Sequence, residues 1–280
     1  MRKKEREQQY VTSRLNNPVL NYQVYVPKSS EKLMVSLLLF LVGGAIGLLF
    51  YGGLFKVEGE NTLATYIAGG IAFLLIGFAA MRFLMPVYLN HCLEKRKVIL
   101  SKQFRAMLSS LSASMSSGSN VQKAFEDALK DLLMQYSEND YIVKEMREIL
   151  NGVAQNINID VLIRDFGERS SNEDIIFFAD VFEVCYRKGG DLKFVIQKTY
   201  QSISEKLEIS DEIETKLTSN KMQHTVMSIM PIVVVAMLKF TNDTFAENFA
   251  TPAGVLVNTI AIGIFVASYR YGLKICDVKV

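Results

Sequence analysis

The stretch LMVSLLLFLVGGAIGLLFYGGLF at residues 33–55 decides the fold class, because it contains no charged side chain. An α-helix rises about 1.5 Å per residue, so a run of this length can cross a hydrocarbon core about 30 Å thick. A secretory signal peptide would have a shorter apolar region, followed by a cleavage pattern of small residues. We therefore expect a retained membrane-spanning helix here.

Three further apolar runs complete a prediction of four spans. Uncharged segments cover residues 61–81 and 248–269. A shorter run at residues 222–238 lies between Lys221 and Lys239, whose long side chains can snorkel and so extend its reach. Half of all residues are hydrophobic, as expected for a polytopic membrane protein. The three cysteines are dispersed and form no CxxC pair, so they indicate neither a disulfide framework nor a zinc site.

Basic residues near the spans predict the orientation, because cytoplasmic loops carry an excess of Lys and Arg. The segment before the first span is strongly basic, whereas residues 56–60 contain one lysine and two glutamates. The loop at residues 239–252 also has one lysine, and residues 270–280 are basic again. We therefore expect both termini in the cytoplasm, together with residues 91–221.

This middle segment predicts a helical bundle, because charged and apolar residues alternate there with a helical period. The expected helices or their apolar stripes cover residues 104–115, 121–132, 141–153, 161–166, 174–186 and 192–217. The stretch 174–186 is apolar on most sides and is expected to form the buried centre. Ser119, Asn120, Val121 and Gln122 have the spacing of a capping box that opens the second helix, with Ser119 as the cap.

The segment RKGGDL at residues 187–192 predicts a tight turn between two helices. Basic residues in a last helical turn favour the negative end of the helix dipole, and Gly189 supplies a left-handed residue behind it. Asp191 is expected to cap the next helix, which runs towards the third span. Pro231 lies inside that span and predicts a kink.

Catalytic chemistry has no recognisable pattern in this chain. Nucleophile elbows, P-loops, HExxH motifs and metal-spaced clusters are all missing from the sequence. His91 and His224 border predicted spans, where interfacial placement is favoured over a metal or proton-relay role. Arg82 lies at the cytoplasmic end of its span, where snorkelling is favoured over function. We expect no enzyme activity, no cofactor and no metal site.

Taken in order, these features resemble the type II secretion system F-domain superfamily, and most closely the TadB-like inner-membrane platform proteins of tight-adherence (Flp-type) pili. The resemblance rests on Gly118 with the apolar stripe behind it, on the turn at residues 187–192, and on the charged helix that enters Met230-Pro231-Ile232. It covers roughly residues 33–270. The residues that match the family turn are Gly118, Gly189, Gly190 and Asp191. Their first expected role is structural, and a role in a surface that faces the ATPase is a hypothesis.

The resemblance implies a scaffold in the bacterial inner membrane without catalytic activity. Such a scaffold couples a cytoplasmic secretion ATPase to the insertion of pilin subunits. A paralogous F-domain platform protein and the lipid bilayer are its other implied partners, and no nucleic acid is expected. Classical platform proteins carry two F domains, whereas this chain shows one, which favours homo- or hetero-oligomerisation.

The predicted class is all-α, a polytopic membrane protein with four transmembrane helices and one cytoplasmic helical-bundle F domain. Its parts are a basic cytoplasmic N-terminal tail (1–32), a first transmembrane hairpin (33–90), the F domain (91–221), a second transmembrane hairpin (222–270) and a cytoplasmic C-terminal tail (271–280). The alternative is a subunit of a membrane transporter or channel, which would need more polar side chains in the spans. A membrane enzyme or sensor is disfavoured, because both predicted outside loops are short.

Overall fold

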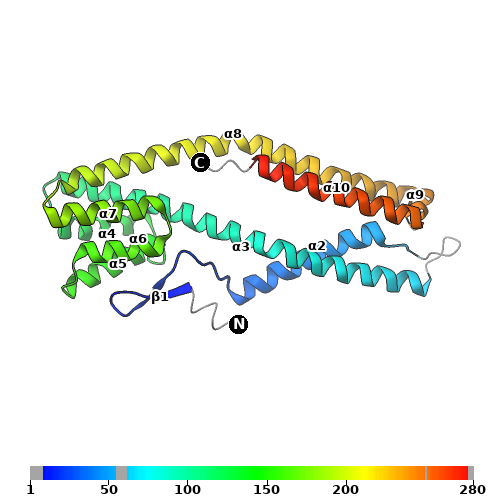
Figure 1. The fold of residues 1–280 in the computed structure, drawn as a ribbon, viewed down its shortest axis with the longest axis horizontal. Coiled ribbons are helices and arrows are strands. Elements are labelled where there is room, and N and C mark those ends of the chain that lie inside the picture. The colour runs from blue at the N-terminus through cyan, green and yellow to red at the C-terminus, as the bar shows by residue number, and fades with distance from the viewer. Residues whose placement is uncertain (1–8, 55–61, 250, 277–280) are drawn as a thin grey trace. The chain divides into compact units, whose positions relative to one another are not determined.

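The computed structural model describes residues 9–54, 62–249 and 251–276, and these residues are mostly helical (Figure 1). The predicted all-α class is confirmed. One short antiparallel hairpin departs from it in the described residues, with Val11 opposite Val19. The elements are β1 (Tyr10–Thr12), β2 (Pro18–Leu20), α2 (Ser29–Tyr51), α3 (Leu63–Ser116), α4 (Val121–Gln135), α5 (Tyr141–Ala154), α6 (Ile159–Ser170), α7 (Glu173–Lys188), α8 (Leu192–Thr241), α9 (Asp243–Phe249) and α10 (Pro252–Cys276).

Four helices of the described chain are long and apolar enough to cross a membrane, which confirms the number of spans by length and composition. They are α2, α3, α8 and the segment Pro252–Tyr269 of α10. The third predicted span was marginal in length, but in the structure it is part of the long helix α8. The predicted orientation also draws on residues 1–8, 56–60 and 277–280, which lie outside the described residues.

The chain divides into two compact units, which we describe separately. The bundle unit consists of Met1–Val26 and Leu89–Ile209. The span unit consists of Pro27–Tyr88 and Ser210–Val280. The long helices α3 and α8 contribute residues to both units, and the segment before the first span is grouped with the bundle unit.

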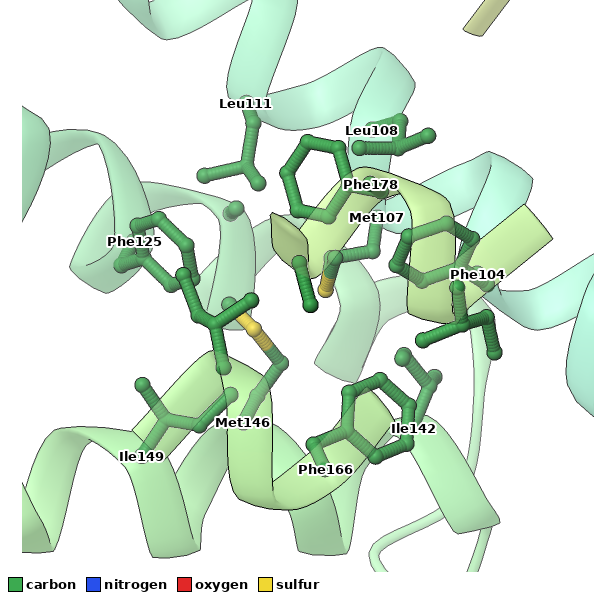
Figure 2. Packing of buried hydrophobic residues seen from close by; sticks show 14 of the residues in the cluster. Phe104, Met107, Leu108, Leu111, Phe125, Ile142, Met146, Ile149, Phe166 and Phe178 are labelled. Atoms are coloured by element: carbon green, nitrogen blue, oxygen red, sulfur yellow. The ribbon is translucent and has the colours of Figure 1, made fainter. Parts of the chain in front are cut away.

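The bundle unit has one hydrophobic core, to which every predicted stripe contributes. Figure 2 shows part of this core. The Phe104 ring of α3 lies 5.4 Å from the Phe178 ring of α7 and 6.2 Å from the Phe166 ring of α6, measured between centroids. Phe125 of α4 and Met146 of α5 complete this packing. Full burial of one such side chain stabilises a fold by roughly 1.5–3 kcal/mol, so the core accounts for the convergence of these helices.

The start of α4 differs from the prediction, because Asn120 and not Ser119 is the cap. The Lys123 backbone amide donates to Asn120 Oδ1 at 2.8 Å. The Ser119 amide instead donates to the carbonyl oxygen of Ser114 at 3.2 Å. The residue before Ser119 is Gly118, whose φ of 93° is left-handed. Ser119 therefore completes the left-handed turn that ends α3, which is why the predicted capping box is wrong.

The prediction that the stretch 174–186 forms the buried centre is correct for one face of α7 only. Its core face is fully buried and comprises Ile175, Phe178, Ala179 and Phe182. On the other side Phe177 is 64% exposed and Val184 is 52% exposed. A helix that is apolar on both sides thus packs one face into the core and leaves the other on the surface of the bundle unit.

Small residues bring α2 and α3 together in the span unit. A Cβ atom added to Gly43 would overlap Ala80, and one added to Gly44 would overlap the Phe73 ring. Close approach of this kind is the usual basis of helix packing in membranes. These two glycines therefore allow α2 and α3 to pack closely in the span unit.

Lys239 has a more specific role than the predicted snorkelling. Its Nζ atom donates to the carbonyl oxygens of Leu49 and Gly52, both at 2.7 Å. These carbonyls lie at the C-terminal end of α2, where helix backbone oxygens lack amide partners and the helix dipole is negative. Lys239 of α8 therefore caps α2 within the span unit.

Candidate partner-binding surface

Helices α7 and α8 are joined by Gly189, Gly190 and Asp191, here called the GGD turn. Gly189 has a φ of 75°, a left-handed conformation that glycine adopts without a steric penalty. The Gly190 amide donates to the Cys185 carbonyl oxygen at 2.8 Å and so closes the end of α7. Asp191 Oδ1 accepts a hydrogen bond from the Phe194 amide at 3.0 Å, which caps α8. The predicted left-handed glycine and aspartate cap are confirmed.

Arg187 fixes the end of α7 to the beginning of α6. Its Nε atom donates to Asp160 Oδ2 at 2.6 Å, and its Nη2 atom lies 3.2 Å from Glu183 Oε1. Asp160 is 1% exposed, so its carboxylate charge depends on Arg187 for compensation. The hydrogen bond with Asp160 raises the pKa of Arg187 above its usual value. The GGD turn therefore follows directly on an anchored helix end.

Sequence reasoning missed this anchor. The sequence pattern predicts only that the Arg187 charge favours the helix dipole, and it does not point to Asp160. The two residues are 27 positions apart, and no local spacing pairs them.

Two large apolar side chains flank the GGD turn in sequence and are exposed. Val184 of α7 is 52% exposed and Phe194 of α8 is 62% exposed. Together with the GGD turn we call them the turn surface. Aromatic and aliphatic side chains on an otherwise charged surface are typical of protein contact sites.

The remaining predicted site residues lie elsewhere. Gly118 occupies the turn between α3 and α4, and no hydrogen bond or ion pair of the described residues joins it to the GGD turn. Pro231 lies inside α8, which continues as one helix on both sides of it, so the kink stays a prediction. Pro86 lies inside α3 in the same way.

A buried network holds the N-terminal segment on the bundle. Arg169 donates to both carboxylate oxygens of Glu145, at 3.0 Å and 2.7 Å, and to the Leu20 carbonyl oxygen at 3.0 Å. The Tyr22 hydroxyl donates to Glu145 Oε1 at 3.0 Å, and Tyr22 is 1% exposed. Burial and the nearby Glu145 charge raise the pKa of Tyr22 well above its usual value. Sequence reasoning missed this network too, because its members are widely separated in the chain.

The residues weighed for other chemistry take ordinary positions. His224 lies against Tyr269, with ring centroids 5.5 Å apart, and His91 and Arg82 are exposed. In the described part of the chain, His, Cys, Asp and Glu form no group of three or more that could hold a metal ion.

Comparison with known proteins agrees with this architecture. Residues 107–239 match the family model described as Type II secretion system (T2SS), protein F. No curated protein and no solved structure matches the chain. Proteins of the matched family are membrane platform proteins rather than enzymes. With the four apolar helices, the match supports a multi-pass inner-membrane protein. The match also supports the assignment of residues 107–239 to the type II secretion system F-domain superfamily.

Proposed function

We propose that this chain is the inner-membrane platform of a Tad-type or other type IV-like pilus, or of a type II-like secretion machine. In this role it couples a cytoplasmic secretion ATPase to the insertion of pilin subunits. The observation that carries the proposal is the F-domain match over residues 107–239, in a chain with four apolar helices of spanning length. The excess of basic residues before the first span and after the last one supports a cytoplasmic bundle unit and cytoplasmic termini.

Two continuous helices support a coupling role. Both α3 and α8 contain part of the hydrophobic core of the bundle unit and also a segment apolar enough to span a membrane. A displacement of the bundle core would therefore act on spans through unbroken helix backbone. Pro231 removes one backbone hydrogen bond within α8, which makes it the natural place for such a helix to bend.

The turn surface is our proposed contact for the ATPase. Its backbone is fixed by the left-handed Gly189 and by the Asp191 cap, and its base is fixed by the Arg187 pair with Asp160. A fixed backbone loses little conformational entropy on binding. The exposed Phe194 side chain offers the kind of aromatic anchor that dominates binding energy at interfaces.

The exposed outer face of α7 is our proposed contact for a second F-domain protein, either another copy or a paralogue. Phe177, which lies outside the turn surface, is 64% exposed there. The chain shows a single F-domain match, whereas the resemblance implies that classical platform proteins carry two F domains.

The test is binding of the full chain, reconstituted in lipid nanodiscs, to a secretion ATPase from the same organism. We expect saturable binding that weakens about tenfold or more in Phe194→Ala, because truncation of an interface anchor costs at least about 1.4 kcal/mol. Phe177→Ala is the matched control, since Phe177 and Phe194 are 64% and 62% exposed. We expect its ATPase affinity to equal that of the unmodified chain.

Two results would count against the proposal. Absence of binding by the intact chain would overturn the platform role with this ATPase. Equal losses in Phe194→Ala and Phe177→Ala would keep the partner and overturn the turn surface as its contact.

A further inference from the structure

A pocket lies between the N-terminal segment and helices α3 and α5 of the bundle unit. Its volume is about 430 Å³, which is in the range of small-molecule sites and well above the size of a single phosphate. The side chains that matter for the argument are Tyr10, Tyr22, Arg96, Tyr141, Lys144 and Arg147. The pocket therefore combines three cationic side chains with three tyrosine rings.

Arg96 is buried without a matching negative charge. It is 6% exposed, and no carboxylate of the described residues lies within 4.0 Å of its guanidinium. Its Nη1 atom donates to the Val24 carbonyl oxygen at 3.2 Å, and its guanidinium carbon lies 4.6 Å from the centroid of the Tyr25 ring and 5.8 Å from that of the Tyr141 ring. Its Nε atom has no hydrogen-bond partner in the described structure. A buried guanidinium is expensive unless an anion or further acceptors compensate it.

The two glutamates of this pocket are already engaged by other groups. Glu145 forms the two-bond pair with Arg169. Glu148 accepts from the Ser13 hydroxyl at 2.7 Å and from the Asn17 amide group at 3.3 Å. They therefore leave the Arg96 charge without a direct partner.

The other two cations of the pocket differ in their partners. Arg147 lies 2.9 Å from Glu138, a carboxylate that does not line the pocket. Lys144 is exposed and has no carboxylate of the described chain within ion-pair distance. Arg96 and Lys144 are therefore the positive groups still available to an anionic ligand.

We propose that this pocket binds a phosphate-bearing small molecule of nucleotide size. Its phosphate would accept hydrogen bonds from Arg96 and Lys144, because guanidinium and ammonium groups form their strongest hydrogen bonds with such anions. Its ring would stack on Tyr10, which lines the pocket and is 51% exposed. The site goes beyond the proposed platform function and gives the chain a means of responding to a soluble metabolite.

The placement of the pocket suggests what the ligand changes. Tyr10 and Tyr22 belong to the N-terminal segment, Arg96 to α3, and Lys144 to α5. A ligand that contacts all three parts holds the N-terminal segment on the bundle more firmly. Binding to the folded state alone also raises its stability in proportion to ln(1 + [L]/Kd).

The experiment is titration of the full chain in nanodiscs with four ribonucleoside monophosphates, inorganic phosphate and adenosine. We expect at least one monophosphate to bind about tenfold more tightly than phosphate, and adenosine to bind more weakly than that monophosphate. Lys144→Gln should weaken the monophosphate about tenfold, through loss of one charge-assisted contact. Tyr10→Ala should weaken the monophosphate and leave phosphate binding unchanged.

Lys123→Gln is the matched control, because it removes the same charge from α4 at a position outside the pocket. Its affinity should equal that of the unmodified chain. Lys144 and Tyr10 are exposed, so their variants keep the fold, whereas Arg96→Gln tests the buried group and needs a thermal-unfolding check beside it. Absence of monophosphate binding overturns the proposal, and so does equal binding by Lys144→Gln and the unmodified chain. ATPase binding is measured separately, so its outcome does not decide this one.

Discussion

The Arg169 guanidinium and the Glu145 carboxylate face each other through two hydrogen bonds, and the two side chains are only 8% and 4% exposed. Glu145 also accepts a hydrogen bond from the Tyr22 hydroxyl, and Arg169 donates to the Leu20 carbonyl oxygen, so both side chains contact the N-terminal segment. Removing one member of a buried ion pair is costly, because the other charge stays buried without compensation. The pair therefore links the stability of the bundle to the docking of a segment far away in sequence.

Glu145→Gln should lower the free energy of unfolding by about 3 kcal/mol. This is the lower end of the usual range for a broken buried pair, because Asp165 still lies 2.8 Å from Arg169. Denaturant unfolding of the purified chain, followed by circular dichroism, measures the loss. Glu138→Gln is the control, since it breaks an exposed pair with Arg147 and should cost less than about 1 kcal/mol. Similar losses in both variants would contradict the buried network.

We expect the bundle unit to lose stability in alkaline solution because of Tyr22. Burial and Glu145 raise its pKa in the folded chain, so the unfolded chain releases this proton first as pH rises. The contribution of Tyr22 is complete below its unfolded pKa of about 10 and is lost progressively above that pH. Tyr22→Phe should therefore reduce the fall in stability above pH 10, although it costs about 1 kcal/mol at neutral pH through the lost hydrogen bond. Unfolding curves from pH 7 to 11 test this, and parallel curves for both proteins would contradict it.

The local features of this fold were predictable, whereas its long-range contacts were not. Apolar residues such as Phe104 and Phe125 recur with the helical period, and this pattern is local. The GGD turn is also local, because glycine and aspartate preferences act over a few residues. By contrast, Tyr22 meets Glu145 across 123 positions, and Arg96 enters a pocket with α5. Nothing in the spacing of one sequence pairs such residues.

The cap of α4 is a local feature that sequence reasoning nevertheless placed one residue too early. Both Ser119 and Asn120 are good caps by type, and the choice depends on the left-handed Gly118 before them. Asn120→Ala should lower the free energy of unfolding by about 1 kcal/mol, because it removes the acceptor of the Lys123 amide. Ser119→Ala should change it little, since Ser119 contributes its backbone amide to the end of α3. Thermal unfolding of the two variants distinguishes them, and a larger loss for Ser119→Ala would support the capping box instead.

Gly189 should tolerate asparagine better than alanine. Its φ of 75° costs an alanine about 1–2 kcal/mol, whereas asparagine adopts this conformation more readily. Space is not the reason, because a Cβ atom added there meets nothing within 4 Å. The melting temperature should therefore fall in the order unmodified chain, Gly189→Asn, Gly189→Ala. Gly263→Ala is the control, because Gly263 also has open space around it but lies inside α10. This substitution should not lower the melting temperature. Equal melting temperatures for the Ala and Asn variants at position 189 would contradict a requirement for the left-handed conformation.

The predicted orientation is tested with single cysteines on a background from which the native cysteines have been removed. Glu138 is exposed in the bundle unit, and Asn248 is exposed between α8 and α10. The basic excess before the first span and after the last one predicts that residue 138 faces the cytoplasm and residue 248 the outside. A membrane-impermeant maleimide should therefore label Asn248→Cys in intact spheroplasts, and Glu138→Cys only after permeabilisation. The reverse pattern would place the bundle unit outside, where no cytoplasmic ATPase could reach the turn surface.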